Sequence, residues 1–137
     1  MQPPTSQIRS VFKQPIEDQY DQLPALIDDS TSLLAGASRG SVAAVLQTVA
    51  DVLNVTLPSE DALAIYYSLL EEYPEDLLRI GAREVCRTYK WPSFPKPADF
   101  INQIQPHLAE RKSDLAAAID RYSLIDRMYR RTKTQEL

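Results

Sequence analysis

The segment EEYPEDLLRIGAREVCRTYKWPSFPKPADFINQI, residues 71–104, contains two proline-started helices and a proline-rich turn between them. Pro74 and Pro97 suit the first turn of a helix, where a backbone N–H has no partner within the helix, and acidic residues follow each of them. The stretch WPSFPKP cannot continue a helix, because its three prolines remove N–H donors and favour extended backbone before them. We therefore predict two helices joined by a turn, which Trp91 and Phe94 anchor on a core.

Apolar residues elsewhere recur at the three- and four-residue spacing of amphipathic helices. This spacing predicts helices over residues 39–54, 60–73, 74–90 and 107–131, and a shorter one that begins at Pro97 and ends or kinks at Pro106. Ser59, which is followed by two acids, is typical of an N-cap. Because no stretch of useful length alternates like a strand, we expect a compact all-α fold of four to five helices.

The chain has 137 residues, enough for one ordinary core. Residues 1–37 are rich in Pro, Gln, Asp and Ser without a sustained period, so we expect a flexible acidic arm with a short helix near residues 16–27. Residues 38–106 are expected to form the helical core domain, and residues 107–137 a long amphipathic C-terminal helix and tail. The arm is expected to be dispensable for folding.

The sequence lacks the motifs of the common enzyme and cofactor classes. No segment matches a glycine-rich phosphate-binding pattern, and no nucleophile–base pair can be identified. Cys86 and His107 are the only residues of their types, which argues against an internal disulfide and against a Cys/His metal cluster. We therefore expect no enzymatic activity, no cofactor and no metal.

The hydropathy of the chain and its cysteine content indicate the cellular compartment in which the protein is expected. No apolar run approaches the length of a membrane span, and the first ten residues lack the basic and apolar regions of a signal peptide. The single cysteine fits a reducing compartment. A cytoplasmic protein without membrane contacts is expected.

The formal net charge of −4 is unevenly distributed along the chain. Residues 1–73 carry a net charge of −7, whereas residues 74–106 carry +1 and residues 107–137 carry +2. This distribution argues against a general nucleic-acid coat, which needs a concentrated basic footprint, but it permits a local basic contact surface.

A basic ridge is predicted on the helix at residues 74–90, formed by Arg79, Arg83, Arg87 and Lys90. It is either a contact surface for nucleic-acid phosphates or an acidic partner, or a solvated face in which Glu75 neutralises Arg79. Tyr89, Trp91 and Phe94 could stack on bases, but their position between two helices favours core packing. Cys86 is interpreted as a small buried hydrophobe.

The C-terminal helix is the main candidate for a partner surface. Its apolar face and its cluster of arginines suit docking into a groove of another protein. The predicted partner-binding residues are Arg121, Tyr122, Ile125, Arg127, Tyr129, Arg130 and Arg131, with the basic ridge as a secondary surface. The alternative is that this helix folds back to complete the core.

A family resemblance rests on Tyr73-Pro74 at a helix junction, Trp91, Phe94-Pro95 and the helix start Pro97-Ala98-Asp99-Phe100-Ile101. In order and spacing, these residues resemble the helical domain of phage replicative-helicase loader and inhibitor proteins, the small non-ATPase partners of DnaB-type hexameric helicases. The resemblance covers residues 57–104, about a third of the chain. The acidic N-terminal arm and the long C-terminal helix lie outside it.

The resemblance implies a non-enzymatic adaptor in the cytoplasm of a bacterial host. Such an adaptor binds the helicase ring, delivers it to the origin and holds its activity in check, with an origin-binding protein or DNA as indirect partners. Two rival functions remain: a small phage DNA-binding protein that uses the basic ridge directly, and an assembly adaptor that oligomerises through its C-terminal helix.

Overall fold

The computed structural model describes residues 4–136 and the side chains of residues 7–132, and every regular element in this part of the chain is helical. The helices are α1 (Pro4–Val11), α2 (Ile16–Ser32), α3 (Arg39–Leu53), α4 (Glu60–Leu70), α5 (Glu75–Thr88) and α6 (Pro97–Glu136). The predicted all-α fold is confirmed. None of the described helices combines the length and the hydropathy that a membrane span requires.

The chain forms two compact units. The core unit is Leu34–Ala109, and the terminal unit combines Met1–Leu33 with Glu110–Leu137. Helix α6 contributes residues to both of them. The arrangement differs from the expected succession of arm, core and C-terminal helix, because the first 33 residues share a unit with the C-terminal part of the chain.

Several helix starts follow from local sequence. Ser59 Oγ accepts a hydrogen bond from the backbone N–H of Ala62 at 3.3 Å, so the predicted N-cap of α4 is confirmed. Pro97 is the first residue of α6, and the backbone N–H of Lys96 donates to the Asp99 carboxylate at 2.8 Å. These bonds satisfy donors that the first helical turn leaves without partners.

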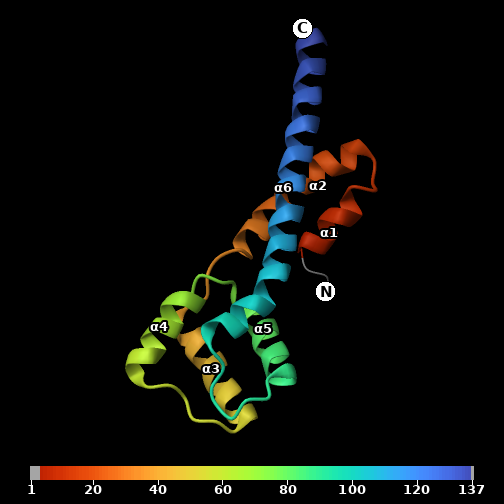
Figure 1. The fold of residues 1–137 in the computed structure, drawn as a ribbon. Coiled ribbons are helices and arrows are strands. Elements are labelled where there is room, and N and C mark those ends of the chain that lie inside the picture. The colour runs from red at the N-terminus through yellow and green to blue at the C-terminus, as the bar shows by residue number, and fades with distance from the viewer. Residues whose placement is uncertain (1–3, 137) are drawn as a thin grey trace. The chain divides into compact units, whose positions relative to one another are not determined.

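The core unit is held together by apolar side chains from α3, α4, α5 and the first turns of α6 (Figure 1). Helix α3 packs on both α5 and α4. The buried cluster consists of Val42, Leu46, Val49, Leu70, Leu77, Leu78, Ala82, Val85, Phe100 and Ile104. Burial of these side chains is the main stabilising term of this unit, since each contributes about 1.5–3 kcal/mol when it is fully removed from water.

Helices α5 and α6 approach closely at Gly81. A Cβ atom at this position would lie 2.7 Å from Ile104 Cγ1, which is shorter than an ordinary van der Waals contact. Both Ile104 and Phe100 are fully buried on α6. The absence of a side chain at Gly81 therefore lets α6 seat directly on α5.

The terminal unit corrects the expectation of a flexible arm. Residues 4–32 form α1 and α2, which bury Ile8, Val11, Leu23 and Leu26 in one cluster with Ala118 of α6. Figure 1 shows α1 and α2 as the red and orange helices beside the blue part of α6. The apolar residues of α1 and α2 are too sparse to predict a core from this region alone. The cluster is completed by α6 residues about a hundred positions further along the chain.

Helix α6 is continuous where two helices were predicted. Pro106 lies inside the helix and does not end it, although it has no N–H to donate to the preceding turn. Apolar side chains on both sides of the proline, Ile104 and Leu108, contact the cluster of the core unit. This packing stabilises the helical conformation across the missing hydrogen bond.

The predicted role of Trp91 is wrong. Its side chain is 71% exposed, whereas Phe94 is half-buried against the core. The Phe94 ring lies 5.7 Å from that of Tyr66 and 6.3 Å from that of Phe100, measured between centroids. The Tyr66 hydroxyl also donates to the Pro95 carbonyl at 2.9 Å. Phe94 and Tyr66 therefore anchor the proline-rich turn, through ring packing and through the hydrogen bond to Pro95.

We predict that Gly81→Ala lowers the free energy of unfolding by roughly 1 kcal/mol, since displacing Ile104 costs more than the alanine gains in helix propensity. The matched control is Gly40→Ala in α3, where an added Cβ meets no atom closer than 4.0 Å. This control should raise the same free energy by up to about 1 kcal/mol. Denaturant unfolding followed by circular dichroism measures both, and equal effects at the two glycines would contradict the close crossing.

For Trp91→Ala, we expect the free energy of unfolding to change by less than about 1 kcal/mol, because the side chain is exposed. Phe100→Ala should lower it by about 3–5 kcal/mol, because that ring is fully buried. The same denaturant experiment compares them. A large loss in the Trp91 variant would show that the indole is packed in solution.

Candidate functional site

The basic ridge lies on α5 and just beyond it. Arg79, Arg83 and Arg87 are exposed on the helix, and exposed Lys90 follows its end by two residues. Arg79 donates to Glu75 at 2.6 Å, as the interpretation of a solvated face expected. The ridge is therefore partly neutralised by carboxylates of its own helix.

The remaining arginines of the ridge differ in their surroundings. Arg87 donates to Glu84 at 2.7 Å, and this hydrogen bond holds the pKa of the Glu84 carboxyl below its usual range. Arg83 adds only a longer-range attraction to Glu84 and makes no hydrogen bond or ion pair with another residue in the described part of the chain. Arg83 is thus the arginine of the ridge best placed to pair with another molecule, and exposed Lys90 beyond the end of α5 is likewise without an ion pair among the described residues.

An open groove of about 810 Å³ runs along the surface where α3 packs on α5, and residues of both helices line it. The α3 side is lined by small uncharged residues at four-residue spacing, Gly40, Ala44, Thr48 and Val52. The opposite side is lined by α5 residues, among them Arg79, Ala82, Arg83 and Cys86. Glu75 also belongs to the α5 side, where it pairs with Arg79, so the groove has an uncharged wall and a basic wall of net charge +1.

The two faces of α3 explain why this groove remains open. Val42, Leu46 and Val49 enter the core, whereas Ala44, Thr48 and Val52 point away from it and are exposed. Because those exposed side chains are short, they leave unfilled space between α3 and α5. Val52 is 63% exposed on the groove wall and extends its apolar surface.

The groove lining contains one thiol and no histidine. Cys86, which lines it, is half-buried, and burial raises the pKa of its thiol, so the thiol stays protonated at neutral pH. His107 is exposed on α6, outside the groove lining. Among the residues that the structure describes, no group of His, Cys, Asp and Glu side chains is placed to hold a metal ion.

The predicted aromatic group is divided between core and surface. Tyr89 and Phe94 pack against the core unit, whereas Trp91 is exposed. Trp91 and Lys90 border a smaller hollow of about 290 Å³, which also touches Asn102 and Gln103 of α6. The structure therefore does not bring the three aromatic rings together as one stacking platform.

The apolar part of the predicted C-terminal partner surface faces the inside of the terminal unit. Ile125 is 1% exposed, and the rings of Tyr122 and Tyr129 lie 5.4 and 4.5 Å from that of Tyr20 in α2. Ile125 is therefore removed from solvent, and Tyr122 and Tyr129 are half-buried beside Tyr20. The alternative, that this helix folds back to complete the core, does not describe the structure either, because Ala118 and Tyr122 pack with α1 and α2.

The four arginines of the predicted C-terminal partner surface differ in their surroundings. Arg121 Nε donates to Gln19 Oε1 at 2.9 Å, and Arg130 pairs with Asp126 at 2.9 Å. Arg127 and Arg131 are exposed on α6. Arg127 also donates to the Ser123 carbonyl of its own helix at 3.4 Å, and neither Arg127 nor Arg131 forms an ion pair within the described part of the chain.

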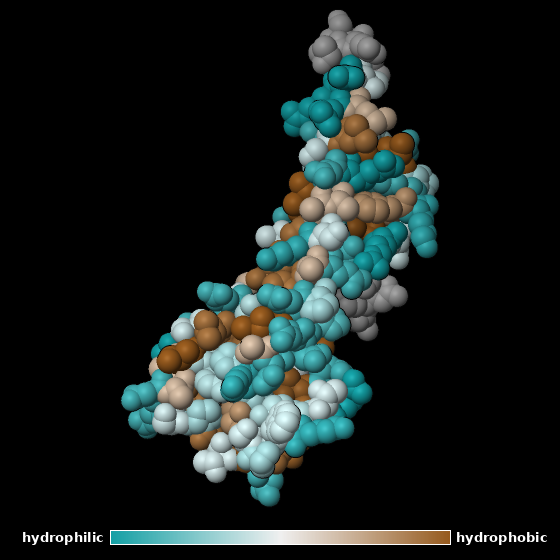
Figure 2. Space-filling model, in the orientation of Figure 1, coloured by the Kyte–Doolittle hydropathy of each residue, from teal (hydrophilic) through white to brown (hydrophobic). Residues whose placement is uncertain are grey.

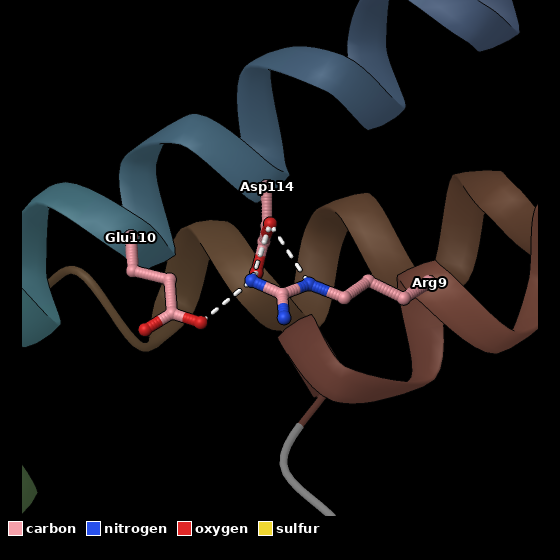
Figure 3. Close-up of polar contacts among 3 residues, drawn as sticks. All are labelled: Arg9, Glu110 and Asp114. Carbon is pink, nitrogen blue, oxygen red and sulfur yellow. Dashed lines mark hydrogen bonds and ion pairs between the residues drawn. The ribbon is translucent and has the colours of Figure 1, made fainter.

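Polar contacts that sequence analysis missed join α1 and α2 to α6. Arg9 Nη2 donates to Glu110 at 2.6 Å and to both carboxylate oxygens of Asp114 at 3.1 Å (Figure 3). Arg111 donates to the Leu33 carbonyl at 3.1 Å. The residues of each contact lie far apart in sequence, so no local pattern indicates them.

Comparison with protein-family models, with curated proteins and with solved structures finds no match to this chain.

The hydrogen bond between Tyr20 and Asp126 makes the stability of the terminal unit depend on pH. The Tyr20 hydroxyl donates to Asp126 at 2.8 Å, and this hydrogen bond, with burial and the carboxylate charge, raises the pKa of Tyr20 to about 12. The folded-state pKa lies above the ordinary value of 10.0, so the stabilisation is complete below pH 10 and is lost as the pH rises towards 12.

Tyr20→Phe should therefore remove the tyrosine that ionises near pH 12 and weaken the loss of stability between pH 10 and 12. Ultraviolet titration of the phenols and thermal melts across this range measure the two effects. Tyr67→Phe, outside this contact, serves as the control. If the variant loses titration amplitude near pH 10 and not near pH 12, the contact with Asp126 is absent.

Proposed function

We propose that this protein is a non-enzymatic adaptor that binds a DnaB-type replicative helicase and loads or restrains it. The proposal is supported by the resemblance of residues 57–104 to phage helicase loader and inhibitor proteins. All of these residues belong to the core unit. Within it, Phe94 and Phe100 pack in the core, and Pro95 is buried, so the residues behind the resemblance build one scaffold.

The observation that carries the proposal is the groove between α3 and α5. An amphipathic helix of a partner can lay its apolar face into such a groove, and a basic wall favours carboxylates beside that face. We therefore assign the primary contact to the groove and to Arg83, in place of the C-terminal helix. Arg127 and Arg131 remain candidates for a secondary contact.

Binding of a partner in the groove is favoured energetically over binding to the C-terminal helix. Most of the free energy of a protein interface comes from a few apolar or arginine side chains that become desolvated on binding. Tyr122, Ile125 and Tyr129 already contact other parts of the terminal unit, so their use by a partner would first require α2 to leave. The groove needs no such rearrangement.

We predict that Val52→Asp and Arg83→Glu each weaken binding to the helicase at least tenfold, because they place an acid in the apolar wall or reverse the charge of the basic wall. Calorimetric titration with a DnaB-type helicase, from the host or encoded with this protein, measures the dissociation constants. The control is Ile119→Asp, which adds the same charge at an exposed isoleucine of α6 away from the groove.

The outcomes of this experiment distinguish the two candidate surfaces from each other and also test the adaptor function. If the double variant Arg127→Glu/Arg131→Glu abolishes binding while both groove variants bind normally, the C-terminal helix is the primary surface. If the unaltered protein binds none of the helicases, the adaptor function is wrong. Circular dichroism melts of every variant separate lost binding from lost folding.

Direct binding of DNA is the second candidate function. It is favoured by the exposure of Trp91 beside Lys90, since an indole with a neighbouring cation can stack on an unpaired base. Binding of single-stranded DNA that weakens steeply with added salt and quenches the fluorescence of Trp91 would support this function over the adaptor.

A further inference from the structure

An exposed apolar stripe runs along the outer face of α4. Ile65 and Leu69 lie one helical turn apart and are 59% and 42% exposed. Asp61 continues the same face one turn earlier, and Glu72 follows the end of the helix. Figure 2 shows apolar side chains at the surface over α4, among hydrophilic ones.

The charge around this stripe is of one sign. Residues 60–72 include four carboxylates, Glu60, Asp61, Glu71 and Glu72, and no basic residue. One of them, Glu71, lies 3.8 Å from Arg39, whereas Glu60, Asp61 and Glu72 are exposed. The stripe is therefore an apolar helix face with acids at both ends.

The groove between α3 and α5 has the complementary character. Its α3 wall carries small uncharged residues and its floor contains Val49 and Ala82. Its α5 wall carries Arg79, which Glu75 of the same wall neutralises, and Arg83. Of these two cations, Arg83 is the one without an ion pair among the described residues. A carboxylate next to an apolar helix face would supply that partner.

The dimensions of the two surfaces also agree. The α3 wall from Gly40 to Val52 comprises 13 residues, about 20 Å at the helical rise. Helix α4 has 11 residues, which gives about 16 Å. None of the residues that line the groove belongs to α4, so one molecule can present both surfaces at once.

We propose that α4 of a second copy of this chain docks in the groove between α3 and α5. Ile65 and Leu69 enter the groove against Val49 and Val52, and the acids at the ends of α4 face the basic wall around Arg83. Because the two surfaces consist of different residues, the contact is head-to-tail. A dimer formed in this way keeps one free groove, on one copy, and one free stripe, on the other, so assembly proceeds to a closed ring or an open chain.

The inference stands independently of the helicase, although both proposals use the same groove. A second copy in the groove would cover the surface that we assign to the helicase, so self-assembly and helicase binding would compete. A single helix in a groove buries little area by the standards of stable complexes, so the association is expected to be weak and dependent on protein concentration.

The test uses the full chain alone. Light scattering and sedimentation from micromolar to millimolar protein measure the mass of the unaltered protein, which should rise with concentration. Ile65→Asp removes the stripe and leaves the groove, whereas Val52→Asp removes the groove and leaves the stripe. Each variant alone should show at least a tenfold weaker association, while the control Ile119→Asp associates normally.

The decisive measurement is a mixture of the two variants. The intact groove of the Ile65→Asp protein accepts the intact stripe of the Val52→Asp protein, so the mixture should form a one-to-one dimer that cannot grow. A symmetric interface predicts no such rescue. The proposal is overturned if the unaltered protein stays monomeric at millimolar concentration, if both variants associate like the unaltered protein, or if the mixture remains monomeric. Circular dichroism melts confirm that each variant is folded.

Discussion

The close crossing of α5 and α6 at Gly81 determines the geometry on which the core unit depends. With no Cβ at this position, Ile104 and Phe100 of α6 seat directly against α5 and are removed from water. Residues on the opposite side of α5, including Arg79 and Arg83, are thereby turned away from α6. The basic wall of the groove is a consequence of which face of α5 the core uses.

The terminal unit shows how an amphipathic helix can lose its availability as a docking surface. Ala118 and Ile125 of α6 are buried, and Tyr122 contacts the α1–α2 cluster. Charged and polar contacts such as Arg9 with Asp114 orient the same helices. An exposed pair of this kind contributes little free energy, so apolar burial stabilises the unit and the polar contacts select its arrangement.

The groove between α3 and α5 is the feature that connects structure with the proposed function. Its uncharged wall offers apolar area without long side chains to displace, and its basic wall confers a preference for acid-flanked helices. The outer face of α4 and a helix of a helicase would satisfy the same requirement. Competition between them would link the assembly state of the adaptor to its occupancy by a partner.

The sequence by itself determined the local features of this protein. The N-cap at Ser59, the start of α6 at Pro97 and the pairing of Glu75 with Arg79 depend on groups within four residues of one another. The basic ridge was predicted for the same reason, because helical periodicity alone places its arginines on one face.

Only the tertiary structure decided which faces are open. The exposure of Trp91, the burial of Ile125 and the packing of α1 and α2 on α6 depend on contacts between distant residues, such as the 105 positions that separate Arg9 from Asp114. The groove likewise exists because short side chains of α3 lie opposite α5. Periodicity identifies the faces of a helix, but the burial of a face depends on what the rest of the chain places against it.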